Sequence, residues 1–123
     1  MLTQIINGKI LTANGWLEGG SIILSDSKIL EIANSDLPRV GATIVDVKGD
    51  YILPGFVAMN IHGGGGHAFK EGTQEAFDTA VKTHLKHGAT TIFPTIYTAK
   101  IEKIYKSAAV CEGILKEGNS PVK

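Results

Sequence analysis

The chain has 123 residues, of which 43% are hydrophobic and 20% charged, and its 12 basic and 12 acidic side chains cancel. This neutral balance gives no sign of a nucleic-acid or anionic-membrane partner, and no apolar run is long enough to span a bilayer. The single cysteine, Cys111, excludes an internal disulfide and favours a reducing cytoplasm as the location. The length suits one small domain with a modest core.

The first 50 residues predict an all-β module, because short apolar stretches alternate there with turn residues. Asn7-Gly8 is a dipeptide typical of a β-hairpin. No cluster of ionisable side chains accompanies these stretches, so we interpret residues 1–50 as a structural module, either a small antiparallel sheet or half of a β-sandwich. The strands are expected at residues 4–6, 9–12, 16–17, 21–24, 28–33 and 43–47.

From residue 51 the pattern changes to strand, helix, strand, helix, which predicts a boundary between domains 1–50 and 51–123. The two strands are expected at residues 56–62 and 89–93, parallel to each other. A first helix is expected between Thr73, which can cap its N-terminus, and Gly88, a typical C-terminal stop. His84 and His87 are interpreted as surface residues of this helix. A third strand is expected to begin in residues 119–123.

The second predicted helix runs from a cap at Thr98 to a stop at Gly118. Apolar residues at helical spacing predict its buried side. These residues are Ile101, Ile104, Tyr105, Ala108, Cys111 and Leu115.

The strand at residues 56–62 carries the clearest chemical signal. Alternation predicts that Val57, Met59 and Ile61 share an apolar face under the helices, whereas the opposite face ends in Asn60 and His62. Loops after parallel strands build active sites, and neutral histidine is a common metal ligand. His62 is therefore a candidate metal ligand beside Asn60, which is a poor donor for zinc. A structural role for a lone histidine is the alternative.

Four glycines follow this strand directly. Gly63, Gly64, Gly65 and Gly66 let the backbone approach a ligand closely, and His67 after them can reach a polar substrate. A flexible loop with a solvated histidine is the alternative interpretation.

The stretch from Pro54 to Gly66 resembles the first barrel strand of the amidohydrolase superfamily, and within it N-acetylglucosamine-6-phosphate deacetylases. The family pattern is roughly Pro-Gly-Phe-Ile-Asp-x-His-x-His-Gly, often followed by a glycine-rich turn. Residues 54–56 and 62–66 match it, as does the order of the segments around residues 88–95. The family's acidic residue falls on Ala58, and its first His of the His-x-His pair falls on Asn60.

The resemblance implies an α/β chain. A partial β-sandwich would be followed by the first two βα units of a (β/α)8 barrel that deacetylates an amino sugar phosphate with a divalent metal, zinc or similar. The family's Glu, two His and catalytic Asp lie on later strands. Two hypotheses follow: an N-terminal part of a deacetylase, inactive and with little or no metal affinity in isolation, or a degenerate non-catalytic relative. Either way, uncovered sheet faces predict a homo-oligomer.

Overall fold

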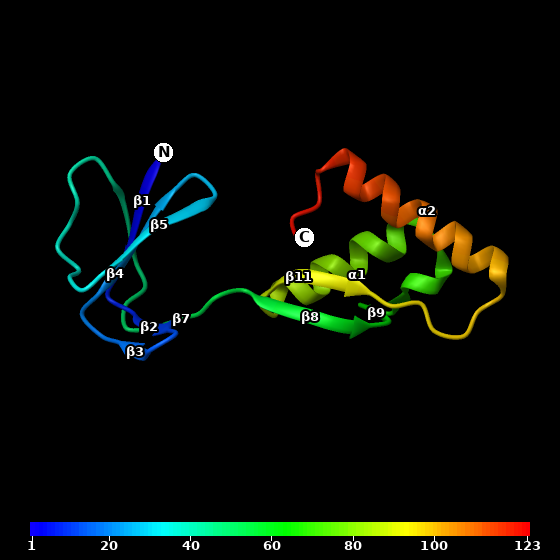
Figure 1. Ribbon diagram of the computed structural model, residues 1–123, viewed down its shortest axis with the longest axis horizontal. Coiled ribbons are helices and arrows are strands. Elements are labelled where there is room, and N and C mark those ends of the chain that lie inside the picture. Colours follow the sequence, from blue (N-terminus) through cyan, green and yellow to red (C-terminus); the bar gives the residue numbers. More distant parts are fainter. The chain divides into compact units, whose positions relative to one another are not determined.

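The structure, a computed structural model, describes residues Met1 to Lys123 and divides them into two units, Met1–Pro54 and Gly55–Lys123. The first unit contains only strands, and the second contains both helices of the chain (Figure 1). Neither helix is long and apolar enough to cross a membrane.

The N-terminal unit consists of two sheets. A four-stranded sheet has the order β5-β4-β1-β6, and a three-stranded sheet has the order β3-β2-β7. Two of the pairings, β1 with β6 and β2 with β7, are parallel, so of the two predicted alternatives the small antiparallel sheet is wrong. The strands are β1 (Leu2–Ile6), β2 (Lys9–Thr12), β3 (Gly15–Leu17), β4 (Ser21–Ser25), β5 (Lys28–Ala33), β6 (Thr43–Asp46) and β7 (Tyr51–Ile52).

Asn7-Gly8 joins strands of different sheets and does not form the predicted hairpin. Asn7 adopts a left-handed backbone with φ of 58°, and its Nδ2 donates to Asp46 Oδ1 at 3.0 Å. A Cβ on Gly8 would lie 2.6 Å from side-chain atoms of Ile52 and Val47. Asn7 and Gly8 therefore form the tight connection between the two sheets. Asn and Gly suit such a connection as well as they suit a hairpin turn.

The core of the N-terminal unit combines three isoleucines with two polar side chains. Gln4 is 1% exposed and Ser21 is fully buried. Gln4 Nε2 donates to Ser21 Oγ at 3.0 Å and to the Leu37 carbonyl at 2.9 Å, while its Oε1 accepts from the Arg39 amide at 2.7 Å. This network holds the segment between β5 and β6 against the sheet. The buried isoleucines are Ile10, Ile22 and Ile23.

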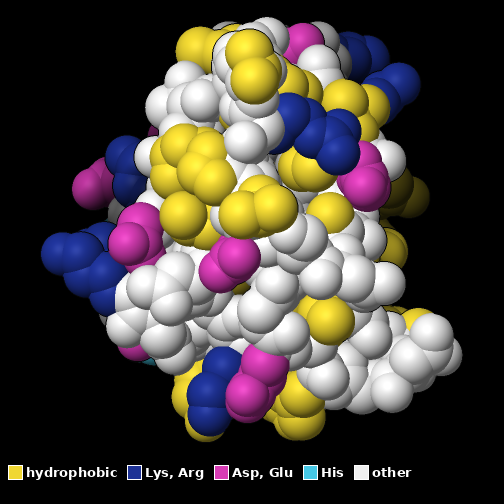
Figure 2. All heavy atoms as spheres, turned by 90° about the vertical axis from the view of Figure 1, so that its left-hand side faces the viewer, with side chains coloured by type: hydrophobic (Ala, Val, Ile, Leu, Met, Phe, Trp, Pro, Cys, Tyr) yellow, Lys and Arg dark blue, Asp and Glu magenta, His cyan; other side chains and the backbone are white.

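The surface of the N-terminal unit is rich in apolar side chains, which Figure 2 shows at one of its faces. Ile29 and Leu30 on the edge strand β5 are more than half exposed. On the other sheet, the rings of Trp16 and Tyr51 meet edge to face, 5.3 Å between centroids.

The second unit places two parallel strands, β8 (Phe56–Ile61) and β11 (Ala89–Pro94), with α1 (Gln74–Lys86) and α2 (Ile101–Glu117) on one side of them (Figure 1). This confirms the predicted strand, helix, strand, helix order. The Thr73 hydroxyl caps α1 by accepting from the Ala76 amide. α2 ends at Gly118, with φ of 65°, as expected, but the predicted Thr98 cap is wrong because α2 begins after Lys100 without a side-chain cap.

The face of β8 that packs under the helices differs from the prediction. Ala58 and Ile61 contact the core, whereas Val57 and Met59 are 59% and 72% exposed. Asn60 has a left-handed backbone, with φ of 58°, and the pairing with β11 shifts register nearby. This irregularity breaks the two-residue alternation, so Ile61 follows Ala58 onto the helix side.

The core of the second unit is an aromatic and aliphatic cluster. The predicted buried side of α2 is displaced, because Ser107 is fully buried and Cys111 is half-buried, whereas Tyr105 and Leu115 are about 70% exposed. Burial raises the pKa of the Cys111 thiol. The cluster contains Phe69, Phe77, Ala80, Ala89, Ile92 and Val122, with Val110, Cys111 and Ile114 of α2 against it.

The C-terminal residues extend the sheet. The Lys123 amide donates to the Thr90 carbonyl at 3.0 Å, and the Ile92 amide donates to the Lys123 carbonyl at 2.6 Å. This is the pattern of a parallel bridge on the free edge of β11, and Val122 beside it is buried. The expectation that a third strand begins in residues 119–123 agrees with this pairing.

Candidate functional site

The glycine loop (residues 63–72) follows β8 and contains a short hairpin, β9 (Gly63–Gly64) with β10 (His67–Ala68), and one 3₁₀ turn, η1 (Phe69–Glu71). The Phe69 amide donates to the His62 carbonyl at 2.9 Å and closes the loop. A Cβ on Gly63 would lie 2.0 Å from the His67 carbonyl oxygen, and Gly65 has φ of 62°. The hairpin therefore requires glycine at these two positions.

The loop brings predicted site residues together around one open depression. His62, Gly63, Gly64, Gly66 and His67 all line it. Three residues that the sequence analysis did not select, Ala68, Glu71 and Tyr97, complete its lining. Asn60 and Gly65 do not line the depression.

His62 is exposed and held from two sides. Its Nδ1 lies 3.2 Å from the Thr95 carbonyl oxygen, and its ring meets Tyr97 edge to face at 4.9 Å between centroids. A carbonyl only accepts, so Nδ1 carries the proton and Nε2 of the neutral ring keeps its lone pair. Histidines that bind metals commonly have this arrangement, with the second ring nitrogen donating to a carbonyl.

His67 and Glu71 form a pair within the loop. His67 Nδ1 lies 3.1 Å from Glu71 Oε2, and Glu71 Oε1 accepts from the Ala68 amide at 2.6 Å. The Ala68 amide and, after it, the His67 side chain hold the pKa of the Glu71 carboxyl below its ordinary value. Glu71 is thus an anion at neutral pH that orients His67.

Tyr97 and Lys70 add a cation to the same place. Lys70 Nζ lies 3.9 Å from the centroid of the Tyr97 ring, within the range of a cation–π contact. Tyr97 reaches the depression from the segment between β11 and α2. No spacing in the sequence marks it as a neighbour of His62, whereas Glu71, four residues after His67, is a detectable partner.

The residues of this chain do not fit a closed metal site. Nowhere do three His, Cys, Asp or Glu side chains approach closely enough to hold a metal ion. His67 Nδ1 is engaged by Glu71, and Asn60 lies on the irregular part of β8 away from the depression. Nε2 of His62 and Nε2 of His67 are the two ring nitrogens at the depression that make no hydrogen bond, and two ligands do not close a metal site.

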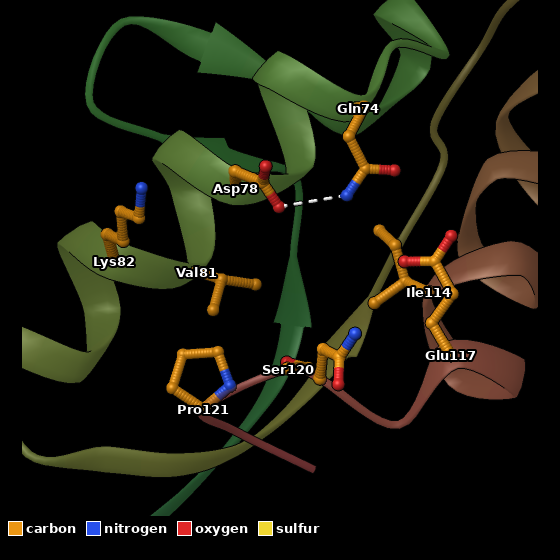
Figure 3. Close-up of a pocket in the computed structure, with 9 residues that line it drawn as sticks. Gln74, Asp78, Val81, Lys82, Ile114, Glu117, Ser120 and Pro121 are labelled. Carbon is orange, nitrogen blue, oxygen red and sulfur yellow. Dashed lines mark hydrogen bonds between the residues drawn. The ribbon is translucent and has the colours of Figure 1, made fainter.

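A second cavity, of about 300 Å³, lies between α1, the end of α2 and the C-terminal residues (Figure 3). Gln74 Nε2 donates to Asp78 Oδ1 at its rim, at 3.0 Å. Lys82, Glu117 and Ser120 also line it, and no histidine does. None of the predicted site residues takes part, so the glycine loop remains the candidate site.

Comparisons with known proteins locate this architecture in one group of hydrolases. No family model matches the sequence. A dihydroorotase of Staphylococcus aureus is 34% identical over 93 residues, which cover 73% of this chain and 20% of that enzyme. An N-acetylglucosamine-6-phosphate deacetylase of Haemophilus influenzae is 26% identical over 118 residues, covering 95% of this chain and 31% of that enzyme.

A solved structure gives the same picture for the fold. The crystal structure of N-acetylglucosamine-6-phosphate deacetylase from Pasteurella multocida superposes with a TM-score of 0.87 at 24% identity, over 95% of this chain and 31% of that one. The chain therefore shares the fold of that part of the deacetylase and spans about a third of its length.

Proposed function

We propose that this chain, which belongs to the amidohydrolase superfamily, supplies the N-terminal part of an N-acetylglucosamine-6-phosphate deacetylase. The observation that carries the proposal is similarity to such deacetylases over 95% of the chain, in sequence and in fold. The substrate would be an amino sugar phosphate whose N-acetyl amide is hydrolysed in the cytoplasm.

We place the chain within such an enzyme as a β-sandwich-like domain followed by the first two βα units of the barrel, with the domains meeting between residues 50 and 55. Three observations support this. β8 and β11 are parallel with both helices on one side, and the C-terminal residues pair with β11 where a third parallel strand would lie. The opposite face of the strands leaves Val57, Met59 and Phe93 more than half exposed, as expected of a face directed into a barrel.

Within that enzyme the glycine loop would contact the substrate, and His62 would be one ligand of a divalent metal completed by residues outside this chain. The metal would supply an activated water and polarise the amide carbonyl. The residues of the chain itself orient groups: Thr95 fixes the His62 tautomer, and Glu71 orients His67.

The experiment compares two proteins. The 123-residue chain should release no acetate from N-acetylglucosamine 6-phosphate above buffer, since a hydrolytic metal site needs about three protein ligands and the depression offers at most two, His62 and His67. If the reading frame continues past codon 123 into further barrel strands, the longer protein should release acetate, and a chelator should abolish the release. Turnover of dihydroorotate in place of the sugar would redirect the proposal to the dihydroorotase group.

A degenerate, non-catalytic relative is the second candidate. It is favoured by Ala58 and Asn60, which replace an acidic residue and a histidine of the deacetylase pattern. A frame that stops after codon 123, or that continues without His and Glu at barrel-strand ends, would support it.

We also propose that the isolated chain is a homodimer. Val57, Met59 and Phe93 expose between 54% and 72% of their surface on the face opposite the helices, and β8 has no second neighbouring strand. A second copy can cover this face and edge. Light scattering at micromolar concentration should give twice the monomer mass, and a folded monomer would contradict the proposal.

A further inference from the structure

We infer that His84 is a positioning residue that holds the glycine loop and, through it, His62 in place; the inference rests on the proposed function of that loop. The sequence predicts an ordinary surface histidine here, and that prediction is wrong. His84 lies on α1 and is half-buried, and its Nε2 lies 2.9 Å from the Gly63 carbonyl oxygen.

His84 can approach the Gly63 carbonyl closely because the glycines of the loop have no side chains in the way. A Cβ on Gly64 would lie 3.1 Å from His84 Nε2 and 3.4 Å from the backbone of Ala80. A Cβ on Gly65 would lie 2.6 Å from Oγ1 of Thr83, the residue directly before His84. The glycines therefore let the loop backbone lie directly on α1, where His84 can reach a carbonyl.

The bond with Gly63 holds the peptide group between Gly63 and Gly64, one residue beyond His62. Since a carbonyl only accepts, His84 Nε2 carries the proton in either charge state of the ring. The bond therefore survives protonation of His84. The His62 carbonyl, one residue earlier, accepts from the Phe69 amide, so the carbonyls of His62 and Gly63 are both fixed.

The far end of the loop is fixed in the same way from the other helix. Ser107 of α2 is fully buried, and its Oγ donates to the Phe69 carbonyl at 2.6 Å. His84 and Ser107 thus anchor the two ends of the segment of residues 63–69, which carries His67. A binding loop rich in glycine needs such anchors, because glycine loses more conformational freedom on ordering than any other residue.

His87 offers a matched control. It lies at the end of the same helix and is exposed, and its Nδ1 contacts the Thr83 carbonyl of its own helix and not the loop. His84→Leu removes the donor, His84→Gln retains an N–H donor near the position of Nε2, and His87→Leu removes a histidine without touching the loop.

The test is amide hydrogen exchange of residues 62–68 in the 123-residue chain, with ¹⁵N spectra of the His62 ring. His84→Leu should speed loop exchange roughly 2- to 10-fold, the effect of one lost hydrogen bond, and should lower the Nδ1-protonated fraction of His62. His84→Gln should restore most of both, and His87→Leu should change neither. Equal effects of His84→Leu and His87→Leu, or no rescue by Gln, would overturn the inference.

The same variants separate this inference from the proposed function. Loop exchange and the His62 tautomer are measured without ligand, so they report positioning alone. N-Acetylglucosamine 6-phosphate is then added to the full-length protein. Failure of the wild-type protein to bind it would count against the proposed function, whereas normal binding by His84→Leu with a disordered loop would count against the positioning role.

Discussion

The N-terminal unit places two polar side chains at the centre of its four-stranded sheet, whereas the second unit buries an aromatic and aliphatic cluster under two helices. In the first, Gln4 and Ser21 are at most 1% exposed. In the second, Phe69 is fully buried and Phe77 is 3% exposed, with their ring centroids 4.8 Å apart. The difference teaches that hydrogen bonds organise the first unit and apolar packing organises the second.

The histidines, like the aromatic core residues, are unevenly distributed between the two units. All four histidines of the chain lie in the second unit, three of them on or against the glycine loop. A unit stabilised by packing of two helices can hold a loop rigidly through side chains such as Ser107. Four sets of variants test this contrast.

The largest effect is expected for Phe77→Ala. The lost side chain leaves a cavity beside Phe69, so the free energy of unfolding of the second unit should fall by about 3–5 kcal/mol. The N-terminal unit should be unaffected, as measured by amide exchange at increasing denaturant. Phe93→Ala, at a side chain 54% exposed, is the matched control and should cost about 1 kcal/mol.

Gln4→Leu should destabilise the N-terminal unit by about 1–3 kcal/mol, because the Leu37 carbonyl and the Arg39 amide lose their partner. Exchange of amides between β5 and β6 should rise most. Gln74→Leu, which removes an exposed Gln on α1, should leave both units unchanged. A neutral outcome for Gln4→Leu would show that apolar packing also dominates the first unit.

Acid should affect the two units alike. The Lys48 amide and the Asn7 side chain hold the pKa of Asp46 below 3.8, and the pKa of Glu71 lies below 4.5. A carboxyl group whose pKa is lower in the folded state than in the unfolded state stabilises the fold at any pH above its unfolded-state pKa. Each of these two carboxylates therefore stabilises its own unit at neutral pH, and this contribution is lost as the pH falls through the folded-state pKa. Asp46→Asn should flatten the acid dependence of the first unit alone, and Glu71→Gln that of the second, in NMR titrations below pH 5.

Asn60→His should have the smallest effect. A second histidine near His62 adds a nitrogen donor, but residue 60 has a left-handed backbone and lies off the depression. Zinc calorimetry should therefore show weak binding by the wild type and a modest gain in the variant, lost again with His62→Ala. Submicromolar, stoichiometric zinc binding by the wild type would contradict this.

Local sequence signals predicted the elements well and their packing less well. Thr73 correctly predicted the start of α1 and Gly118 the end of α2, because capping residues act within one turn of the helix. The helix-facing residues of β8 could not be predicted, since one left-handed residue, Asn60, reversed the alternation. The division of β1 and β2 between two sheets could not be predicted either, because Asn7-Gly8 suits both a hairpin turn and a connection between sheets.

The candidate site was predictable where its residues adjoin in sequence. His62, the glycines and His67 share one loop, and the structure gathers them with the exception of Gly65. Tyr97 and His84 reach that loop from distant segments, so only the fold could reveal them. Whether these residues bind metal or substrate stays a prediction.

The edge-to-face contact of Trp16 with Tyr51 has an optical consequence. Trp16 is the one tryptophan of the chain, and it lies in the N-terminal unit, more than half exposed. Excitation at the red edge of indole absorption therefore reads the environment of that unit and is blind to Phe77 or the glycine loop. Emission spectra and far-ultraviolet circular dichroism, which is dominated by α1 and α2, would follow the melting of the two units as separate signals in one cuvette.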